Sequence, residues 1–150
     1  MNMKISIFGI LLLVGAIIAL AAIFLNWWSA YGVGITGWDF FAKDGGAGEL
    51  TSLYIVPLIL LILAIVAILI ALMEFTGIGA EMNMIMKIVA IVVGILIIVL
   101  PIAMMMDIWS GTPISWTEFL AFGFWLEVAA GAIIAVAAVL SLLKVLPEPA

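Results

Sequence analysis

The residue best placed to do chemistry in this sequence is Glu127, an acidic side chain inside a long apolar run. A carboxyl is costly to bury in a membrane, and such residues usually face the interior of a helix bundle and often serve a function. Small residues recur every four positions around it, at Gly123, Gly131 and Ala135. This spacing places the carboxyl on a helix face that is suited to close packing against another helix.

Two interpretations of Glu127 follow from this position. The carboxyl is either proton-linked and part of a transporter, or neutral and hydrogen-bonded so that it fixes the register of the helices. The second is favoured, because no basic residue is expected at the same depth and the two halves of the chain show no repeat.

Several residue types that carry common enzyme chemistry are absent. The chain has no cysteine and no histidine, which removes thiolate nucleophiles, most zinc sites and the commonest general base. The acidic side chains expected on the outer side of the membrane lack the ligand spacing of a calcium loop. We interpret them as solvated charges: Asp39, Asp44, Glu49, Asp107 and Glu118. We therefore expect no enzyme, no cofactor and no metal site.

The composition is that of an integral membrane protein. Hydrophobic residues make up 69% of the chain and charged residues 9%, and the mean hydropathy is +1.55. The net charge of −5 offers no basic patch, so nucleic acid is not an expected partner. The expected partner is the lipid bilayer.

Four apolar runs are long enough to cross a hydrocarbon core, which takes about 20 residues as a helix. Helices are expected because a single strand cannot satisfy its backbone hydrogen bonds in lipid. The spacing of Ser115 and Glu118 is typical of a capping box and predicts that the last helix begins near Trp116. We therefore predict an all-α bundle of four transmembrane helices in one domain, at about residues 5–25, 53–73, 85–106 and 117–144.

The lysines predict the orientation of these helices. Lys4, Lys87 and Lys144 fall on the side of both termini, and only Lys43 falls on the other side. Positive charge is enriched in cytoplasmic connections, so we expect both termini in the cytoplasm of a multi-pass cell-membrane protein. The outer connections are then about residues 28–52 and 107–116, and the inner connection is about 74–84. All tryptophans lie in or beside the outer connections, at Trp27, Trp28, Trp38, Trp109, Trp116 and Trp125.

The segment "NWWSAYGVGITGWDFF" follows the first predicted helix. We expect Asn26 to Trp28 at the outer end of that helix, with Trp27 and Trp28 at the level of the lipid head groups. Bulky residues then alternate with small ones at Tyr31, Val33 and Ile35, which favours a short β-hairpin over an irregular loop. Aromatic belts usually occupy both membrane surfaces, so a one-sided set suggests a further role. The candidate interaction surface is Trp28, Tyr31, Trp38, Asp39, Phe40, Phe41, Trp109 and Trp116.

This arrangement resembles the claudin and peripheral-myelin-protein superfamily of tetraspan proteins. The first outer loop of that family carries a tryptophan followed by Gly-Leu-Trp and two cysteines, and Trp28, Gly37 and Trp38 match part of this pattern. The leucine and both cysteines are absent here. Similar tryptophan-rich first loops occur in uncharacterised prokaryotic four-helix membrane proteins. The resemblance implies a four-helix fold with an outer sheet after the first helix.

Two functional hypotheses of different classes result. In the first, the chain is a non-enzymatic tetraspan with a structural, accessory-subunit or cell-surface role, and its outer loops contact a membrane-protein complex or another copy. In the second, it is a small proton- or cation-coupled transporter or channel that uses Glu127. A water-filled cavity reaching Glu127 would favour transport, whereas a dry, packed bundle would favour the interaction role.

Overall fold

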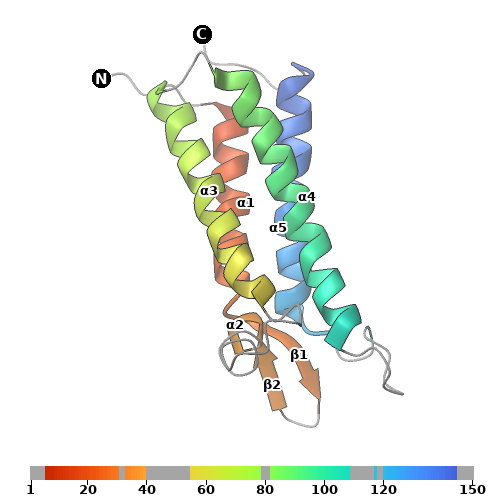
Figure 1. Ribbon diagram of the computed structural model, residues 1–150. Coiled ribbons are helices and arrows are strands. Elements are labelled where there is room, and N and C mark those ends of the chain that lie inside the picture. The colour runs from red at the N-terminus through yellow and green to blue at the C-terminus, as the bar shows by residue number, and fades with distance from the viewer. Residues whose placement is uncertain are drawn as a thin grey trace.

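The computed structural model describes residues 6–30, 33–39, 55–78, 82–108, 117 and 120–144. Four long helices lie side by side in a bundle, and a two-stranded hairpin extends from one end of it (Figure 1). The elements are α1 (Ile7–Ala22), β1 (Asn26–Ala30), β2 (Val33–Thr36), α2 (Gly37–Asp39), α3 (Val56–Thr76), α4 (Asn83–Ile108) and α5 (Phe122–Leu142). We call the end that carries the strands the hairpin end. The opposite end, where α1 and α4 begin and α3 and α5 end, is the base.

Apolar side chains point outward along all four long helices. On α1 they recur at Ile10, Val14 and Ile17, at the spacing of one helix face. In water, so large an exposed apolar surface would drive association, whereas in a bilayer it faces lipid. Within the described residues, α3, α4 and α5 are long and apolar enough to cross a membrane, and α1 is apolar but shorter, with 16 residues. The mainly helical fold is confirmed, and these three helices are compatible with the membrane protein that the composition predicts.

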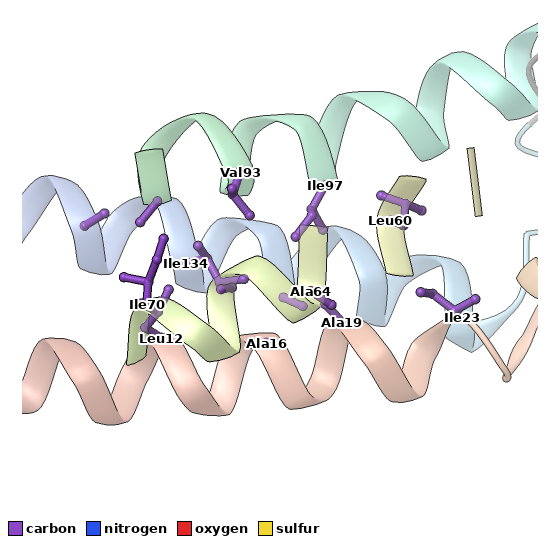
Figure 2. Close-up of a cluster of buried hydrophobic side chains, with 14 of the residues drawn as sticks. Leu12, Ala16, Ala19, Ile23, Leu60, Ala64, Ile70, Val93, Ile97 and Ile134 are labelled. Carbon is purple, nitrogen blue, oxygen red and sulfur yellow. The ribbon is translucent and has the colours of Figure 1, made fainter. Parts of the chain in front are cut away.

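The core fills the space between the four helices with small and branched side chains. Alanines on α1 and α3 allow the helix backbones to approach closely, as is typical of membrane bundles. Figure 2 shows side chains from all four long helices pointing into the same space: Leu12, Ala16, Ala19, Ile23, Leu60, Ala64, Ile70, Val93, Ile97 and Ile134.

The first helix is shorter than the apolar run predicts, because its last residues form a turn. We expected the helix to reach residue 25, but α1 ends at Ala22. The N–H groups of Phe24 and Leu25 donate to the carbonyls three residues earlier, which tightens the last turn and ends the helix. Asn26 to Trp28, expected at the end of this helix, belong instead to β1.

The second helix is displaced along the chain relative to the prediction of 53–73. It begins at Val56, with Pro57 in its first turn, and continues to Thr76. Gly77 ends it with a φ of 75°, a left-handed conformation that glycine adopts without strain. The third helix also exceeds its predicted range of 85–106 by two residues at each end.

The fourth helix begins at Phe122 and not at residue 117 as predicted. Leu120 pairs with Trp28 as an antiparallel bridge, and Ala121 has an extended backbone. Strand-like pairing with the hairpin therefore occupies the residues just before the helix. The predicted capping residues Ser115 and Glu118 lie outside the described residues.

The predicted hairpin is confirmed as a two-stranded antiparallel sheet. Trp28 pairs with Ile35, and Ala30 pairs with Val33. The register shifts between Asn26 and Trp28, so Trp27 is an extra residue on β1. Such a bulge bends the strand and changes the direction of a side chain.

Candidate functional site

The Trp27 side chain lies inside the protein and joins three elements. It is 0% exposed, and its indole Nε1 donates to the carbonyl oxygen of Ala22 over 2.8 Å. The same carbonyl oxygen also accepts from the N–H of Leu25, so the indole is a second donor to the end of α1. The ring of Phe124 of α5 packs edge to face with the indole, with 6.1 Å between the ring centres. Gly37 lies against the indole, and a Cβ added at Gly37 would be 2.5 Å from Cε2 of Trp27. We call Ala22, Trp27, Gly37 and Phe124 the Trp27 clasp.

The expectation that Trp27 anchors the protein at the lipid head groups is therefore wrong. Trp27 is the extra residue of the bulge in β1, and a bulge changes the direction of a side chain, so the indole points into the bundle and not toward the membrane surface.

Backbone contacts also attach the hairpin to the start of α5. The N–H of Ala121 donates to the carbonyl of Trp27 over 2.8 Å, next to the bridge between Trp28 and Leu120. At Gly123 the backbone of α5 comes so close to β1 that an added Cβ would lie 2.6 Å from the carbonyl oxygen of Asn26. Only glycine leaves room for this approach.

The Gly37-Trp38-Asp39 sequence has a structural role in α2. The N–H of Thr36 donates to Asp39 Oδ2 over 3.1 Å, and the N–H of Asp39 donates to Thr36 Oγ1 over 3.0 Å. This reciprocal pair is a capping box, and the T-x-x-D spacing of Thr36 and Asp39 is its signal in the sequence. The N–H of Trp38 donates to the carbonyl oxygen of Ile23. The Trp38 ring contacts the Phe24 ring, with 5.7 Å between the ring centres.

The structure places only some of the predicted interaction residues. Trp28, Trp38 and Asp39 are half-buried at the hairpin end, where Trp28 and Trp38 pack against the core. The other members of that surface lie outside the described residues: Tyr31, Phe40, Phe41, Trp109 and Trp116. We call residues 26–30 and 33–39 the platform.

Three exposed aromatic side chains lie near the hairpin end of the helices. Phe24, Phe122 and Trp125 are 51%, 72% and 54% exposed, respectively. Their positions at the helix ends are typical of an aromatic belt at the membrane surface. Sequence reasoning did not identify Phe24 or Phe122, although their positions at the ends of apolar runs were a usable signal.

Glu127 lies inside the bundle near the hairpin end. It is 0% exposed, and neither carboxyl oxygen has a hydrogen-bond partner in the structure as described. It comes five residues after Phe122, so it is about 7.5 Å along α5 from the start of that helix. The hydrogen bond that would make this carboxyl a register-fixing group is not found among the described residues.

The small-residue face around Glu127 packs as its spacing predicts. Gly131 meets Gly94 of α4, and an added Cβ at Gly131 would lie 2.7 Å from the carbonyl oxygen of Gly94. A Cβ on Gly94 would in turn lie 2.6 Å from the backbone nitrogen of Ala135. The two backbones are therefore in contact without intervening side chains.

Two cavities are lined by described residues, and Glu127 is not in the wall of either. One, of about 200 Å³, is lined only by apolar side chains of α4 and α5. The other, of about 260 Å³, lies at the base. Among the described residues, no three His, Cys, Asp or Glu side chains are grouped so that they could hold a metal ion.

Comparisons of the chain with protein family models, with curated proteins and with solved structures give no match. Any assignment of function must therefore come from the geometry of the platform, of Glu127 and of the cavities.

Proposed function

We propose that this chain is a non-enzymatic tetraspan membrane protein and that its platform is a surface for protein interaction. The observation that carries the proposal is the attachment of the hairpin to the bundle. A two-stranded hairpin is marginally stable by itself in water, yet here the Trp27 clasp and the bonds to α5 hold it in one position. Fixing a surface before binding lowers the entropy that binding must overcome.

The packing of the bundle supports the same proposal. A transporter must alternate between two arrangements of its helices around a site. Here α4 and α5 are in backbone contact at Gly94 and Gly131, and the described cavities do not include Glu127. This geometry favours a rigid scaffold over a moving one.

The proposed topology has four membrane spans. The outward apolar face of α1 supports a membrane position for this helix as well, with the following turn adding to its length. Lys87 and Lys144 both lie at the base, so the base is the cytoplasmic side and the platform is outside. The resemblance to the claudin and peripheral-myelin-protein superfamily is part of this proposal and is supported by the position of the hairpin after α1.

A site-specific photo-crosslinking residue tests the interaction role. We expect the residue placed at Ser29, which is exposed on β1, to give one discrete protein adduct in intact membranes, with another protein or with a second copy of this chain. The matched control is the same residue at Val92, which is exposed on the apolar face of α4. Protein adducts, detected by gel and mass spectrometry, should form from position 29 and not from the control position. If both positions give only lipid adducts, the interaction role is wrong.

A second candidate function is proton- or cation-coupled transport through Glu127, favoured by one observation. A buried carboxyl without a hydrogen bond costs about 1–3 kcal/mol of stability, so its presence needs a reason outside folding. The platform makes no use of this group.

Replacing Glu127 by leucine is therefore expected to stabilise the protein by about 1–3 kcal/mol, because the unbonded polar group is removed. Unfolding in mixed micelles measures this change. Glu127→Gln in proteoliposomes tests transport, with the exposed Asp107→Asn as the control for loss of one charge. Loss of ion flux in Glu127→Gln alone would establish transport. A destabilised leucine variant with normal flux in the glutamine variant would instead show that the carboxyl is structural.

A further inference from the structure

Glu127 is the one fully buried acidic side chain in the described part of the chain. The other buried polar residues of that part are at the base, where Ser6 caps the start of α1 and where Lys87 and Ser141 line a cavity. The two carboxyl oxygens of Glu127, which have no hydrogen bond, lie instead in the half of the bundle that ends at the hairpin. A buried polar group in such apolar surroundings indicates a function.

The elements packed against this carboxyl bring no opposite charge to it. α5 packs mainly against α1, α4 and β1. The described residues of α1 and β1 include no charged side chain. On α4, Lys87 lies at the base and Asp107 is exposed near the hairpin end. These described elements therefore provide no ion-pair partner for Glu127.

The oxygens available at this depth suit a proton and not a metal ion. Pro101 lies inside α4 and has no N–H, so the carbonyl oxygen of Ile97 lacks its usual helical donor. Ile97 packs against α5 one turn from Glu127, because a Cβ added at Gly131 would lie 3.0 Å from Ile97 Cγ2. This carbonyl adds one oxygen to the two of the carboxyl, whereas Mg²⁺ and Ca²⁺ take six or more. A proton needs one oxygen.

The path from the membrane surface to Glu127 is shorter at the hairpin end than at the base. The carboxyl is five residues from Phe122, or about 7.5 Å along α5, but 15 residues from Leu142, or roughly 22 Å. The backbone contact between Gly94 and Gly131 also lies on the base side of the carboxyl. A proton therefore reaches Glu127 most directly from the hairpin end.

The hairpin covers this short path. Trp27 and Phe124 are both 0% exposed and pack edge to face at the start of α5. At Gly123, one turn before Glu127, the backbone of α5 meets the backbone of β1 without an intervening side chain. The bonds from Ala121 to Trp27 and from the Trp27 indole to α1, each 2.8 Å, hold β1 in this position. Figure 1 shows the hairpin at the end of the bundle where α5 begins.

We propose that Glu127 binds and releases a proton that enters from the hairpin end, and that the hairpin is a lid over this site. Release of the Trp27 clasp opens the path, and the proton then passes between a carboxyl oxygen and water. Closure of the clasp separates the two. The inference rests on the second candidate function in taking Glu127 as the functional group. It names the proton as the ligand and requires binding, not net transport.

Infrared spectroscopy of the full-length protein in phosphatidylcholine nanodiscs tests the ligand. The carbonyl stretch of the protonated carboxyl is identified as the band that Glu127→Gln lacks, and it is followed during a pH titration. We expect the band to appear and disappear reversibly, at the same pH in solutions of choline, Na⁺, K⁺, Mg²⁺ or Ca²⁺ of equal ionic strength. Competition by one of the metal ions, or a band that does not respond to pH, would overturn the proposal.

The rate at which this proton exchanges for deuterium tests the lid. Transfer into D₂O, at a pH where the band is present, shifts the band, and the rate follows the fraction of molecules whose lid is open. Trp27→Phe keeps a ring but loses the indole N–H, so we expect about fivefold faster exchange for the loss of one hydrogen bond. Trp125→Phe is the matched control, because Trp125 is 54% exposed and outside the clasp.

Ile134→Val controls for a general loss of stability. It removes one buried methyl group from α5 on the base side of Glu127, so it lowers stability without loosening the hairpin. We expect its exchange rate to equal that of the unaltered protein. An unchanged rate in Trp27→Phe, or equal acceleration in Trp27→Phe and Ile134→Val, would show that the hairpin is not a lid. Proton binding without ion flux in proteoliposomes would reject transport and leave this inference intact.

Discussion

Gly131→Leu is expected to destabilise the bundle by about 3 kcal/mol or more, or to prevent its assembly. The Cβ of any residue at this position would lie 2.7 Å from the carbonyl oxygen of Gly94 and 2.8 Å from the side chain of Ile98. The first of these atoms is backbone, so α4 and α5 would have to separate along their contact. Overpacking a well-filled core typically costs 1–3 kcal/mol, and a backbone clash is at the upper limit or beyond.

Ala129→Leu is the matched control for this substitution. Ala129 is two residues earlier on α5 but exposed on its outer face, so the same leucine meets only lipid there. We expect its free energy of unfolding to change by less than about 0.5 kcal/mol. Reversible unfolding in mixed micelles, followed by tryptophan fluorescence, compares the two. Equal stability of both variants would show that α4 and α5 do not cross closely at Gly94.

Trp27→Ala is expected to cost about 3–5 kcal/mol and to release the hairpin from the bundle. The substitution removes a fully buried aromatic side chain and its hydrogen bond to Ala22, and it leaves a void beside Phe124 and Gly37. Hydrogen exchange should show faster exchange of the β1 and β2 amides than in the unaltered protein, because the clasp no longer restricts their opening.

Two further tryptophan variants separate the contributions to this effect. Trp27→Phe keeps a ring but loses the indole N–H, so we expect a smaller loss that includes about 1 kcal/mol for the hydrogen bond. Trp125→Ala removes a tryptophan that is 54% exposed and should cost less than either. If Trp27→Ala lowered the free energy of unfolding no more than Trp125→Ala does, the inward position of Trp27 would be wrong. A role of Trp27 as a membrane anchor would then be supported.

The amino-acid sequence predicted the features that depend on local patterns. The apolar runs were long enough to indicate membrane helices, and the spacing of Gly123, Gly131 and Ala135 indicated a packing face. The alternation through Val33 and Ile35 indicated a strand, which the structure confirms as β2. Each of these patterns repeats with the period of one element, so it is visible without knowledge of the rest of the chain.

The sequence was misleading at two helix ends, where a specific hydrogen bond and not the apolar pattern sets the boundary. The hydropathy pattern predicted that the first helix reaches residue 25. The capping signal predicted that the last helix begins near Trp116. The end of α1 is instead set by a turn and by the Trp27 indole, and the start of α5 by the bond from Ala121 to Trp27. These partners are separated by more than ninety residues in the second case. A local pattern cannot encode such a pairing.

The candidate site shows the same division. That Glu127 is buried followed from its apolar neighbours, but the lack of a bonding partner among the described residues became apparent only from the packed helices. The gathering of Lys87 and Lys144 around one cavity also depends on the antiparallel packing of α4 against α5.

The sequence by itself determined the long apolar helices, the small hairpin and the close-packing face, because hydropathy and periodicity act within each element. Only the tertiary structure decided that Trp27 turns inward, that Gly37 and Gly123 leave room for their neighbours, and that two lysines share a cavity. The physical reason is that these features arise from a bulge and from contacts between elements. These contacts stabilise the protein only once the helices have packed against one another.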